Sequence, residues 1–396
     1  MSHPDPIVIT SIARTPMGGF QGDFADIRAP ELGAAAIKAA VGRSGLQPDA
    51  IEEILMGCVL PAGQGQAPAR QAALAAGMPL GAGCTTINKM CGSGMKAVML
   101  AHDLLLAGTN RVMVAGGMES MSNAPYLLPK ARAGLRMGHG QVIDHMFCDG
   151  LEDAYDKGRL MGTFAEDCAQ HFGFSRAAQD EFAIASLQRA KQAIESGAFK
   201  AEITPFTVAG RKGDRVVDTD EQPHKAAIDK IPGLRPAFRK DGTVTAANSS
   251  SISDGAAALV LMRRSEAEQR GINPLAVIHG HSTFAGQPGW FTTAPVYAMQ
   301  QLLGKLNWDA KAVDLYEINE AFAVVTMTAM HELALPHEKV NVHGGACALG
   351  HPIGASGARI LVTLLAALQR HGLKRGMASL CIGGGEATAV AVELLA

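Results

Sequence analysis

The sequence has little charge of either sign and few aromatic residues. Charged residues make up 18% of the 396 residues, aromatic residues 5%, and 35 Lys and Arg stand against 37 Asp and Glu, a formal net charge of −2. Nucleic-acid-binding proteins need a basic face to neutralise phosphates, so this balance argues against that class. With 47% hydrophobic residues, the composition also excludes a disordered chain and indicates a large folded core.

Long apolar runs are missing as well. The longest unbroken one covers residues 256–262, far short of the roughly 20 residues that cross a bilayer. We therefore expect no interaction with a membrane. Neither end of the sequence carries a signal, transit or peroxisomal motif, which predicts a cytoplasmic location.

The cysteines follow neither the pattern of a structural metal site nor that of a disulfide framework. Their number is odd, and no two of them stand at zinc-finger spacing. We expect free thiols in a reducing compartment and no bound metal. The seven are Cys58, Cys84, Cys91, Cys148, Cys168, Cys347 and Cys381.

Segments suited to strands alternate with segments suited to helices. Residues 7–12 form an apolar run typical of a buried strand, and 29–41 is typical of a helix with Pro30 and Glu31 in its first turn. A further strand is expected at 111–115, ending at a pair of glycines. Such alternation predicts an α/β protein built around a central sheet.

The middle third, 122–250, departs from this alternation. It is richer in charge and in turn-forming residues, and it contains one clear helix, 176–196, which ends at Gly197. The alternation resumes at 255–262. We therefore expect the middle third to be an insertion into the α/β core.

Two distant parts of the sequence resemble each other. Each starts with a Ser-Gly pair, at Ser93 and at Ser356, continues as a long apolar helix and a short strand, and ends in glycines before Glu119 and Glu386. The match predicts two similar halves whose central helices begin at equivalent points and face one pocket. A coincidence between two helices rich in small residues is the alternative.

Cys91 stands just before the first of these helices. Backbone N–H groups and the helix dipole stabilise an anion there and lower the pKa of a thiol. An ordinary cysteine, with a pKa of about 8.5, is only about 3% thiolate at pH 7. The position therefore favours a nucleophile, whereas a buried structural cysteine is the commoner alternative.

Three further residues stand where chemistry is possible. His351 lies in a Gly-rich turn ahead of the second helix, where an imidazole deprotonates a thiol or donates to an oxyanion. That turn lacks the Lys-Ser/Thr ending of a phosphate-binding loop. Cys381 ends a strand followed by glycines, which suits a proton-shuttling thiol beside backbone donors. Asn319 follows an apolar segment and serves either as a helix cap or to hold a water.

Four motifs, in this order, resemble those of thiolases: N-x-x-C-G-S-G at 88–94, N-E-A-F at 319–322, G-H-P-x-G-x-S-G at 350–357 and C-x-G-G-G at 381–385. The resemblance covers essentially the whole sequence. It implies the thiolase fold, an α/β fold of two similar five-layered α-β-α-β-α halves with an inserted loop domain. The expected units are 1–121 plus 251–272 as the N-terminal half, 122–250 as the CoA-binding loop domain, and 273–396 as the C-terminal half.

The resemblance also implies an acyl transfer, 2 acetyl-CoA to acetoacetyl-CoA and CoA. Cys91 would be acylated by a 3-ketoacyl-CoA and would pass the acyl group to CoA, while Cys381 would move the proton of the α-carbon. His351 would activate Cys91 and, with a water held by Asn319, would stabilise the enolate. The backbone N–H groups of Cys91 and Gly383 would bind the tetrahedral oxyanion.

Partners and binding residues are implied in the same way. Acyl-CoA and CoA would be substrates rather than permanently bound cofactors, and the chain would form a homodimer or a homotetramer. The candidate residues are Ser250 and Phe238 for the pantetheine arm, His224 and Lys225 for the phosphates of CoA, and Leu160, Met161, Phe291 and Phe322 around the acyl chain.

Two departures from the family pattern border the acyl pocket. Leu160 stands where short-chain thiolases commonly have His, and Phe291-Thr292 stands in place of Met-Gly. They leave a broader-chain 3-ketoacyl-CoA thiolase of fatty-acid or aromatic degradation as one alternative. A decarboxylating ketoacyl synthase, which would not need Cys381, is a second. A non-catalytic scaffold or lipid-binding subunit, which would need no active-site residue, is a third.

Overall fold

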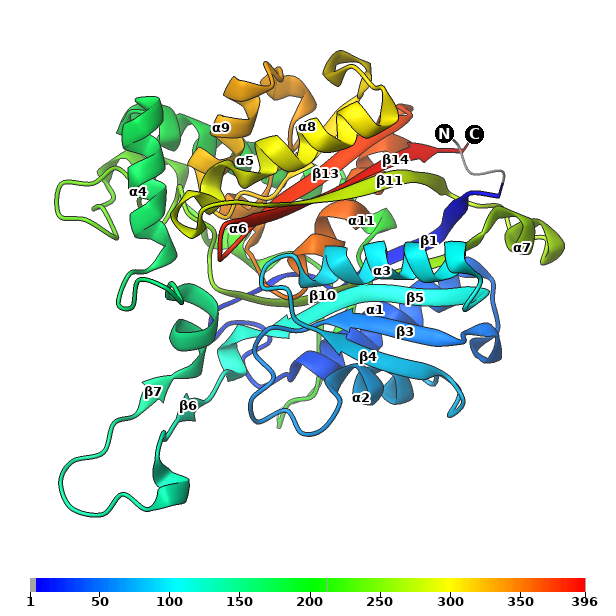
Figure 1. The fold of residues 1–396 in the computed structure, drawn as a ribbon, viewed down its shortest axis with the longest axis horizontal. Coiled ribbons are helices and arrows are strands. Elements are labelled where there is room, and N and C mark those ends of the chain that lie inside the picture. Colours follow the sequence, from blue (N-terminus) through cyan, green and yellow to red (C-terminus); the bar gives the residue numbers. More distant parts are fainter. Residues whose placement is uncertain (1–4, 212, 396) are drawn as a thin grey trace.

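The computed structural model describes residues 5–211 and 213–395 as five stacked layers of helices and sheets (Figure 1). In Figure 1 the two sheet halves lie above and below a central layer made of α3 and α11. Helices α1 and α2 cover the outer face of the lower half, and α8 covers that of the upper half. The five layers therefore run through both halves of the chain together.

The strands and helices of the lower half are β1 (Ile7–Arg14), β2 (Gly18–Gly19), α1 (Ala29–Ser44), β3 (Glu53–Gly57), α2 (Pro68–Ala75), β4 (Gly83–Ile87), α3 (Ser93–Ala107), β5 (Val112–Ser120), β10 (Ser253–Arg263) and α7 (Arg264–Gln269). Those of the upper half are β11 (Ala276–Ala285), α8 (Ala294–Leu306), β12 (Leu315–Ile318), α9 (Ala323–Glu332), α10 (Ala346–Leu349), α11 (Ser356–His371), β13 (Arg375–Ile382) and β14 (Glu386–Leu394). The middle segment adds β6 (Tyr126–Leu127), β7 (Ile143–Asp144), α4 (Met161–Phe172), α5 (Arg176–Glu195), β8 (Phe206–Val208), β9 (Arg215–Val217) and α6 (Glu221–Lys225).

Hydrogen bonds connect the main strands in the order β12-β13-β14-β11-β1-β10-β5-β3-β4. Within the sheet, β1 of one half pairs with β11 of the other, where Val8 pairs with Val277 and Ile9 with Ala276. Every residue of β1 is buried, as expected for an apolar strand covered on both faces. The strand predicted at 7–12 and the helix predicted at 29–41 are thus both confirmed, and each extends a little further.

The strand predicted at 111–115 was placed too short. β5 continues through Gly116 and Gly117, which the sequence analysis took as its end. A Cβ at Gly116 would overlap the carbonyl oxygen of Ala257 on β10, and one at Gly117 would overlap that of Gly354. These glycines therefore permit close backbone contact inside a strand rather than ending it.

The resemblance between the two parts of the sequence corresponds to a structural repeat. Helices α3 and α11 pack against each other at the centre, each followed by a buried strand, β5 and β13. Their first turns touch through glycine, because a Cβ at Gly94 would lie 2.8 Å from the backbone nitrogen of Ala358. The two helix starts are therefore held side by side, as the sequence analysis predicted.

The middle segment contains a helix that the sequence analysis missed. It expected 176–196 as the one clear helix there, and α5 confirms that helix, but α4 precedes it. The Gly162-Thr163 pair near the start of α4 has low helix propensity, which hid the helix. Burial of Phe164, Ala165 and Cys168 against the upper half stabilises it instead.

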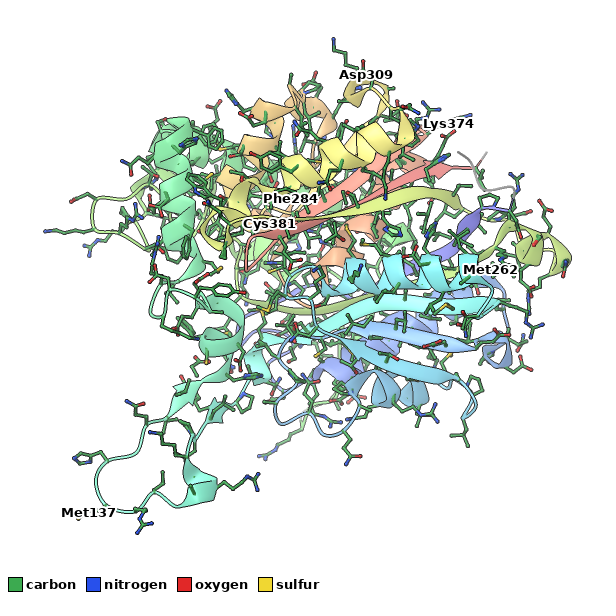
Figure 2. All side chains as sticks on the ribbon, viewed as in Figure 1. Met137, Met262, Phe284, Asp309, Lys374 and Cys381 are labelled. Carbon is green, nitrogen blue, oxygen red and sulfur yellow. The ribbon has the colours of Figure 1, made fainter. Side chains whose placement is uncertain are left out.

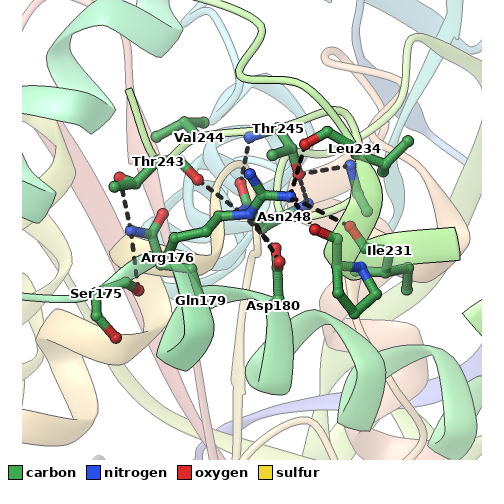
Figure 3. Close-up of polar contacts among 12 residues, drawn as sticks. Ser175, Arg176, Gln179, Asp180, Ile231, Leu234, Thr243, Val244, Thr245 and Asn248 are labelled. Carbon is green, nitrogen blue, oxygen red and sulfur yellow. Dashed lines mark hydrogen bonds and ion pairs between the residues drawn. The ribbon is translucent and has the colours of Figure 1, made fainter. Parts of the chain in front are cut away.

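The middle segment has one part that projects from the molecule and one part that polar contacts hold against it. Between β6 and β7 the chain projects from the body of the molecule, with fully exposed Met137 near the tip of this projection (Figure 2). Near the body, polar contacts tie the stretch after α6 to α5 (Figure 3): Asn248 Nδ2 donates to Asp180 Oδ1 at 3.1 Å, and Arg176 donates to the carbonyl of Leu234 at 2.8 Å. These contacts position Ser249–Ile252, which line the cavity described below.

No helix within the described residues is both long enough and apolar enough to span a bilayer. The unit boundaries expected at 121, 250 and 272 stay a prediction.

Candidate active site

A cavity of about 360 Å³ lies where the two halves and the middle segment meet. Its size is in the range of small-molecule sites, and its wall is mostly apolar with a few polar groups. The predicted residues that line it are Cys91, Leu160, Met161, Phe238, Ser250, Phe291, Phe322, His351, Cys381 and Gly383. Figure 2 labels Cys381 at the left-hand end of the upper half of the sheet.

Cys91 lies two residues before α3, and the backbone N–H groups of Gly383 and of Cys91 itself act to lower the pKa of its thiol. Nevertheless, burial raises the pKa of this thiol to about 11. The prediction that the helix N-terminus lowers the pKa was therefore wrong. The apolar surroundings outweigh the backbone donors, which the sequence around Cys91 does not reveal. At pH 7 Cys91 is a neutral thiol that needs a base.

His351 is a buried, neutral imidazole at the wall of the cavity. Burial, followed by the positive charge of Arg359, lowers its pKa to about 3. The Ser356 hydroxyl donates to the carbonyl of Pro352 at 3.0 Å, so its oxygen accepts the Nδ1–H of His351 at 2.6 Å. This leaves the Nε2 lone pair, which has no partner among the described residues, as the proton acceptor of the ring.

Asn319 lies beside His351, with its amide nitrogen 3.5 Å from Nδ1. It is not the helix cap that the sequence allowed, because α9 begins only at Ala323, with Phe322 as its cap. Asn319 instead sits in the loop after β12, where its N–H donates to the carbonyl of Ser379 at 3.0 Å. Its buried Oδ1 has no hydrogen-bond partner within the described part of the chain, which leaves an acceptor for a water.

Cys381 is the second thiol of the cavity. It is the last but one residue of β13, and burial together with the neighbouring Cys91 raises its pKa well above that of an ordinary cysteine. The turn after it contains Gly384 and Gly385, both in the left-handed region with φ of 92° and 87°. This turn places Gly383 in the wall of the same cavity as Cys91, where its backbone N–H acts to lower the pKa of the Cys91 thiol.

Aromatic side chains form one wall of the cavity. Phe238 packs closely over Gly162 and meets the ring of Phe322 edge to face, with centroids 6.0 Å apart. Ser250 lies beside them, and both its N–H and its hydroxyl donate to the carbonyl of Ala321. Leu160 supplies no polar group at this wall, and Phe291 supplies none either.

Two predicted residues lie elsewhere. His224 and Lys225 are exposed on α6 and are not part of the cavity wall. Lys225 forms an ion pair with Glu221 one turn earlier in the same helix. The structure thus does not bring these two residues to the cavity.

The sequence analysis missed two buried residues that support the site. Glu119 on β5 accepts the N–H of Val59 at 2.9 Å and that of Gly354 at 2.8 Å, joining the loop after β3 to the turn that holds His351. Burial raises the pKa of Glu119 to about 7. Ser356 is the other, through its contact with His351. Ser356 stands in the motif at 350–357 and Glu119 at the end of the first of the two similar parts, but their contacts become visible only in the folded chain.

Models of the N-terminal and C-terminal thiolase domains match residues 7–265 and 272–394. The chain belongs to the thiolase family. An acetyl-CoA acetyltransferase of Cupriavidus necator is 49% identical over 98% of this chain and 99% of its own length. Among solved structures, an acetyl-CoA acetyltransferase of Bacillus anthracis superposes with a TM-score of 0.96 at 41% identity, covering 99% of each chain. A thiolase of Ascaris suum in complex with coenzyme A superposes at 0.93 and 41% identity, covering 98% of this chain and 100% of its own.

Proposed function

We propose that this thiolase transfers acyl groups between acyl-CoA and CoA, with 2 acetyl-CoA to acetoacetyl-CoA and CoA as its reaction. The observation that carries the proposal is that one cavity brings together two thiols and a neutral imidazole, Cys91, Cys381 and His351. The printed name of the Cupriavidus relative and the coenzyme A bound to the Ascaris thiolase agree with it.

In the thiolysis direction, the proton of Cys91 moves to Nε2 of His351 as the sulfur attacks the 3-keto carbon. The N–H groups of Cys91 and Gly383, which act to lower the pKa of this thiol, receive the negative charge of the oxygen. One such donor typically lowers a barrier by about 2.7–4 kcal/mol. The C2–C3 bond then breaks, which leaves an acyl-Cys91 and the enolate of acetyl-CoA.

The enolate takes the proton of Cys381 at its α-carbon, while Nε2–H of His351 and a water on Asn319 stabilise its oxygen. An incoming CoA thiol returns a proton to Cys381 and attacks the acyl-Cys91. The released Cys91 sulfur recovers its proton from His351, so the cycle closes with no redox or metal chemistry in any step.

Acylation and proton exchange separate the two thiols experimentally. Acetyl-CoA alone should acetylate Cys91, seen by intact-protein mass spectrometry, and the Cys91→Ser variant should show no adduct. Cys381→Ser should still be acetylated but should lose exchange of the α-protons of acetyl-CoA with deuterated water. Cys168→Ser is the matched control, because Cys168 is buried near the cavity but bonds Thr328 instead of lining it.

The outcomes also discriminate among the candidate functions. An absent adduct with every acyl-CoA tried would favour the scaffold or lipid-binding subunit, and condensation that requires a malonyl thioester would favour the ketoacyl synthase. Equal loss of both activities in the Cys91 and Cys381 variants would contradict the separate roles.

A broader-chain 3-ketoacyl-CoA thiolase is the second candidate, and the apolar wall at Leu160 and Phe291 favours it. Rates of thiolysis across 3-ketoacyl-CoAs of increasing length decide between the two. If acetoacetyl-CoA is turned over no faster than the longer substrates, the narrower assignment fails.

The finer expectations belong to this proposal as well: a cytoplasmic location, a role in lipid metabolism, and a homodimer or homotetramer. Light scattering coupled to size-exclusion chromatography tests the last of these directly.

A further inference from the structure

Three possible metal ligands meet away from the cavity, on the second half of α3 and on β11. They are His102 and Asp103 from the helix and His281 from the strand, and their ligand atoms all lie within 4.8 Å of one another. One carboxylate oxygen, Asp103 Oδ1, is 3.0 Å from Nδ1 of His102 and 2.8 Å from Nε2 of His281. The two rings stand edge to face, with centroids 5.1 Å apart.

We propose that His102, Asp103 and His281 form a site for a divalent transition metal ion of the zinc class. Two imidazole nitrogens and one carboxylate oxygen are donors that Zn²⁺, Co²⁺ and Ni²⁺ prefer, whereas Mg²⁺ and Ca²⁺ prefer oxygen. Ligands at about 2.0–2.1 Å from a tetrahedral ion lie roughly 3.4 Å apart. The separations of Asp103 Oδ1 from His102 Nδ1 and His281 Nε2 are close to that value, so small rotations of the side chains accommodate the ion.

The surroundings suit an ion with further ligands from water. The side chains of His102 and His281 are 10% and 17% exposed, whereas that of Asp103 is 52% exposed, so the site opens toward solvent on the carboxylate side. Lys305 donates to the backbone carbonyl of His281.

The site is a structural one. His102 lies nine residues after the start of α3, which at 1.5 Å per residue is about 14 Å along the helix from its catalytic end. An ion there ties α3, in the central layer, to β11, in the upper half of the sheet. No metal was expected from the spacing of the cysteines. The sequence does not reveal this group, because 178 positions separate Asp103 from His281.

Cobalt binding to the chelator-treated enzyme tests the site. We expect one Co²⁺ per chain by equilibrium dialysis, visible d–d bands without a thiolate-to-cobalt charge-transfer band, and a rise in unfolding temperature of about 2 °C or more. Asp103→Asn, a substitution of an exposed side chain that preserves its shape, should weaken binding at least about tenfold. His281→Ala should do the same, and acetyl transfer should be unchanged in both variants.

His279→Ala is the matched control, because His279 is on the same strand but pairs with Glu393, and it should bind Co²⁺ like the wild type. The absent charge-transfer band separates this site from the thiols Cys91 and Cys381. The proposal is overturned if the wild type retains no cobalt, if Asp103→Asn binds it equally well, or if the spectrum shows sulfur ligands.

Discussion

Replacing Gly357 with alanine tests whether the contact between the two central helices holds the site together. A Cβ at Gly357 would overlap the backbone nitrogen of Met95 and would lie 2.8 Å from its Cβ. These atoms belong to the first turn of α3 and cannot move aside without moving the helix. Overpacking of this kind costs about 1–3 kcal/mol, occasionally more. A gain of roughly 0.5–1 kcal/mol from the better helix propensity of alanine opposes that cost.

Gly42 provides the control, because it lies inside α1 and a Cβ there would meet nothing within 4 Å. Gly42→Ala should therefore stabilise the protein by roughly 0.5–1 kcal/mol. The difference between the two variants isolates the steric term, which we expect to be about 1–3 kcal/mol in urea unfolding followed by circular dichroism.

Activity provides the second readout. The two helix starts carry Cys91 and His351, and a displacement of about 1 Å at a reacting centre costs on the order of 10²-fold in rate. Gly357→Ala should therefore lose much of its acetyl transfer under conditions where it is still folded, whereas Gly42→Ala should keep it. If Gly357→Ala unfolds at the same urea concentration as Gly42→Ala and retains full activity, the reasoning about the helix contact is refuted.

Three further substitutions test other parts of the structure. Ser356→Ala removes the acceptor of the buried N–H of His351, which should lower the free energy of unfolding by about 1–3 kcal/mol and lower kcat for acylation. Ser379→Ala is the control, because it loses a similar hydrogen bond inside β13 and should keep kcat. Burial lowers the pKa of His343 to about 4, below its unfolded value of about 6.5, so its contribution to the free energy of unfolding is intact above pH 6.5 and is lost as the pH falls. His343→Gln should therefore reduce the loss of unfolding free energy between pH 7.5 and 5 by about 2 kcal/mol. An unchanged dependence of the unfolding free energy on pH would contradict the buried neutral histidine. Phe291→Ala should lower the free energy of unfolding by about 3–5 kcal/mol and shift kcat/KM toward longer 3-ketoacyl-CoAs. Phe164 packs against Phe291 but does not line the cavity, so Phe164→Ala should lower the free energy of unfolding as much without that shift.

Local patterns in the sequence predicted those features that depend on neighbouring residues. The apolar run at 7–12 predicted a buried strand, and Pro30 with Glu31 predicted the start of a helix; the structure contains both. The repeated Ser-Gly pairs predicted the central helices, because a glycine in the first turn permits the close approach that the structure contains.

Features that depend on distant residues were missed or misjudged. Gly116 and Gly117 were predicted to end β5. They are needed there because the carbonyl groups of Ala257 and Gly354, both distant in sequence, lie directly against them. The pKa of Cys91 depends on how deeply the fold buries it, so a rule based on the helix dipole alone gave the wrong sign. Ser356 stands five residues from His351, but only the path of the chain through Pro352 makes the hydroxyl its partner.

The raised pKa of Cys91 and the lowered pKa of His351 have one consequence for how the proposed reaction starts. Both groups are neutral at pH 7, and an ion pair between them would place two charges in an apolar cavity, which is costly without further partners. A substrate carbonyl changes this, because the charge that leaves sulfur arrives on an oxygen beside the N–H of Gly383. Proton transfer and attack on the carbonyl are therefore coupled. Acylation then depends on the glycine turn after Cys381, which supplies the N–H of Gly383, as much as on the Cys91 thiol.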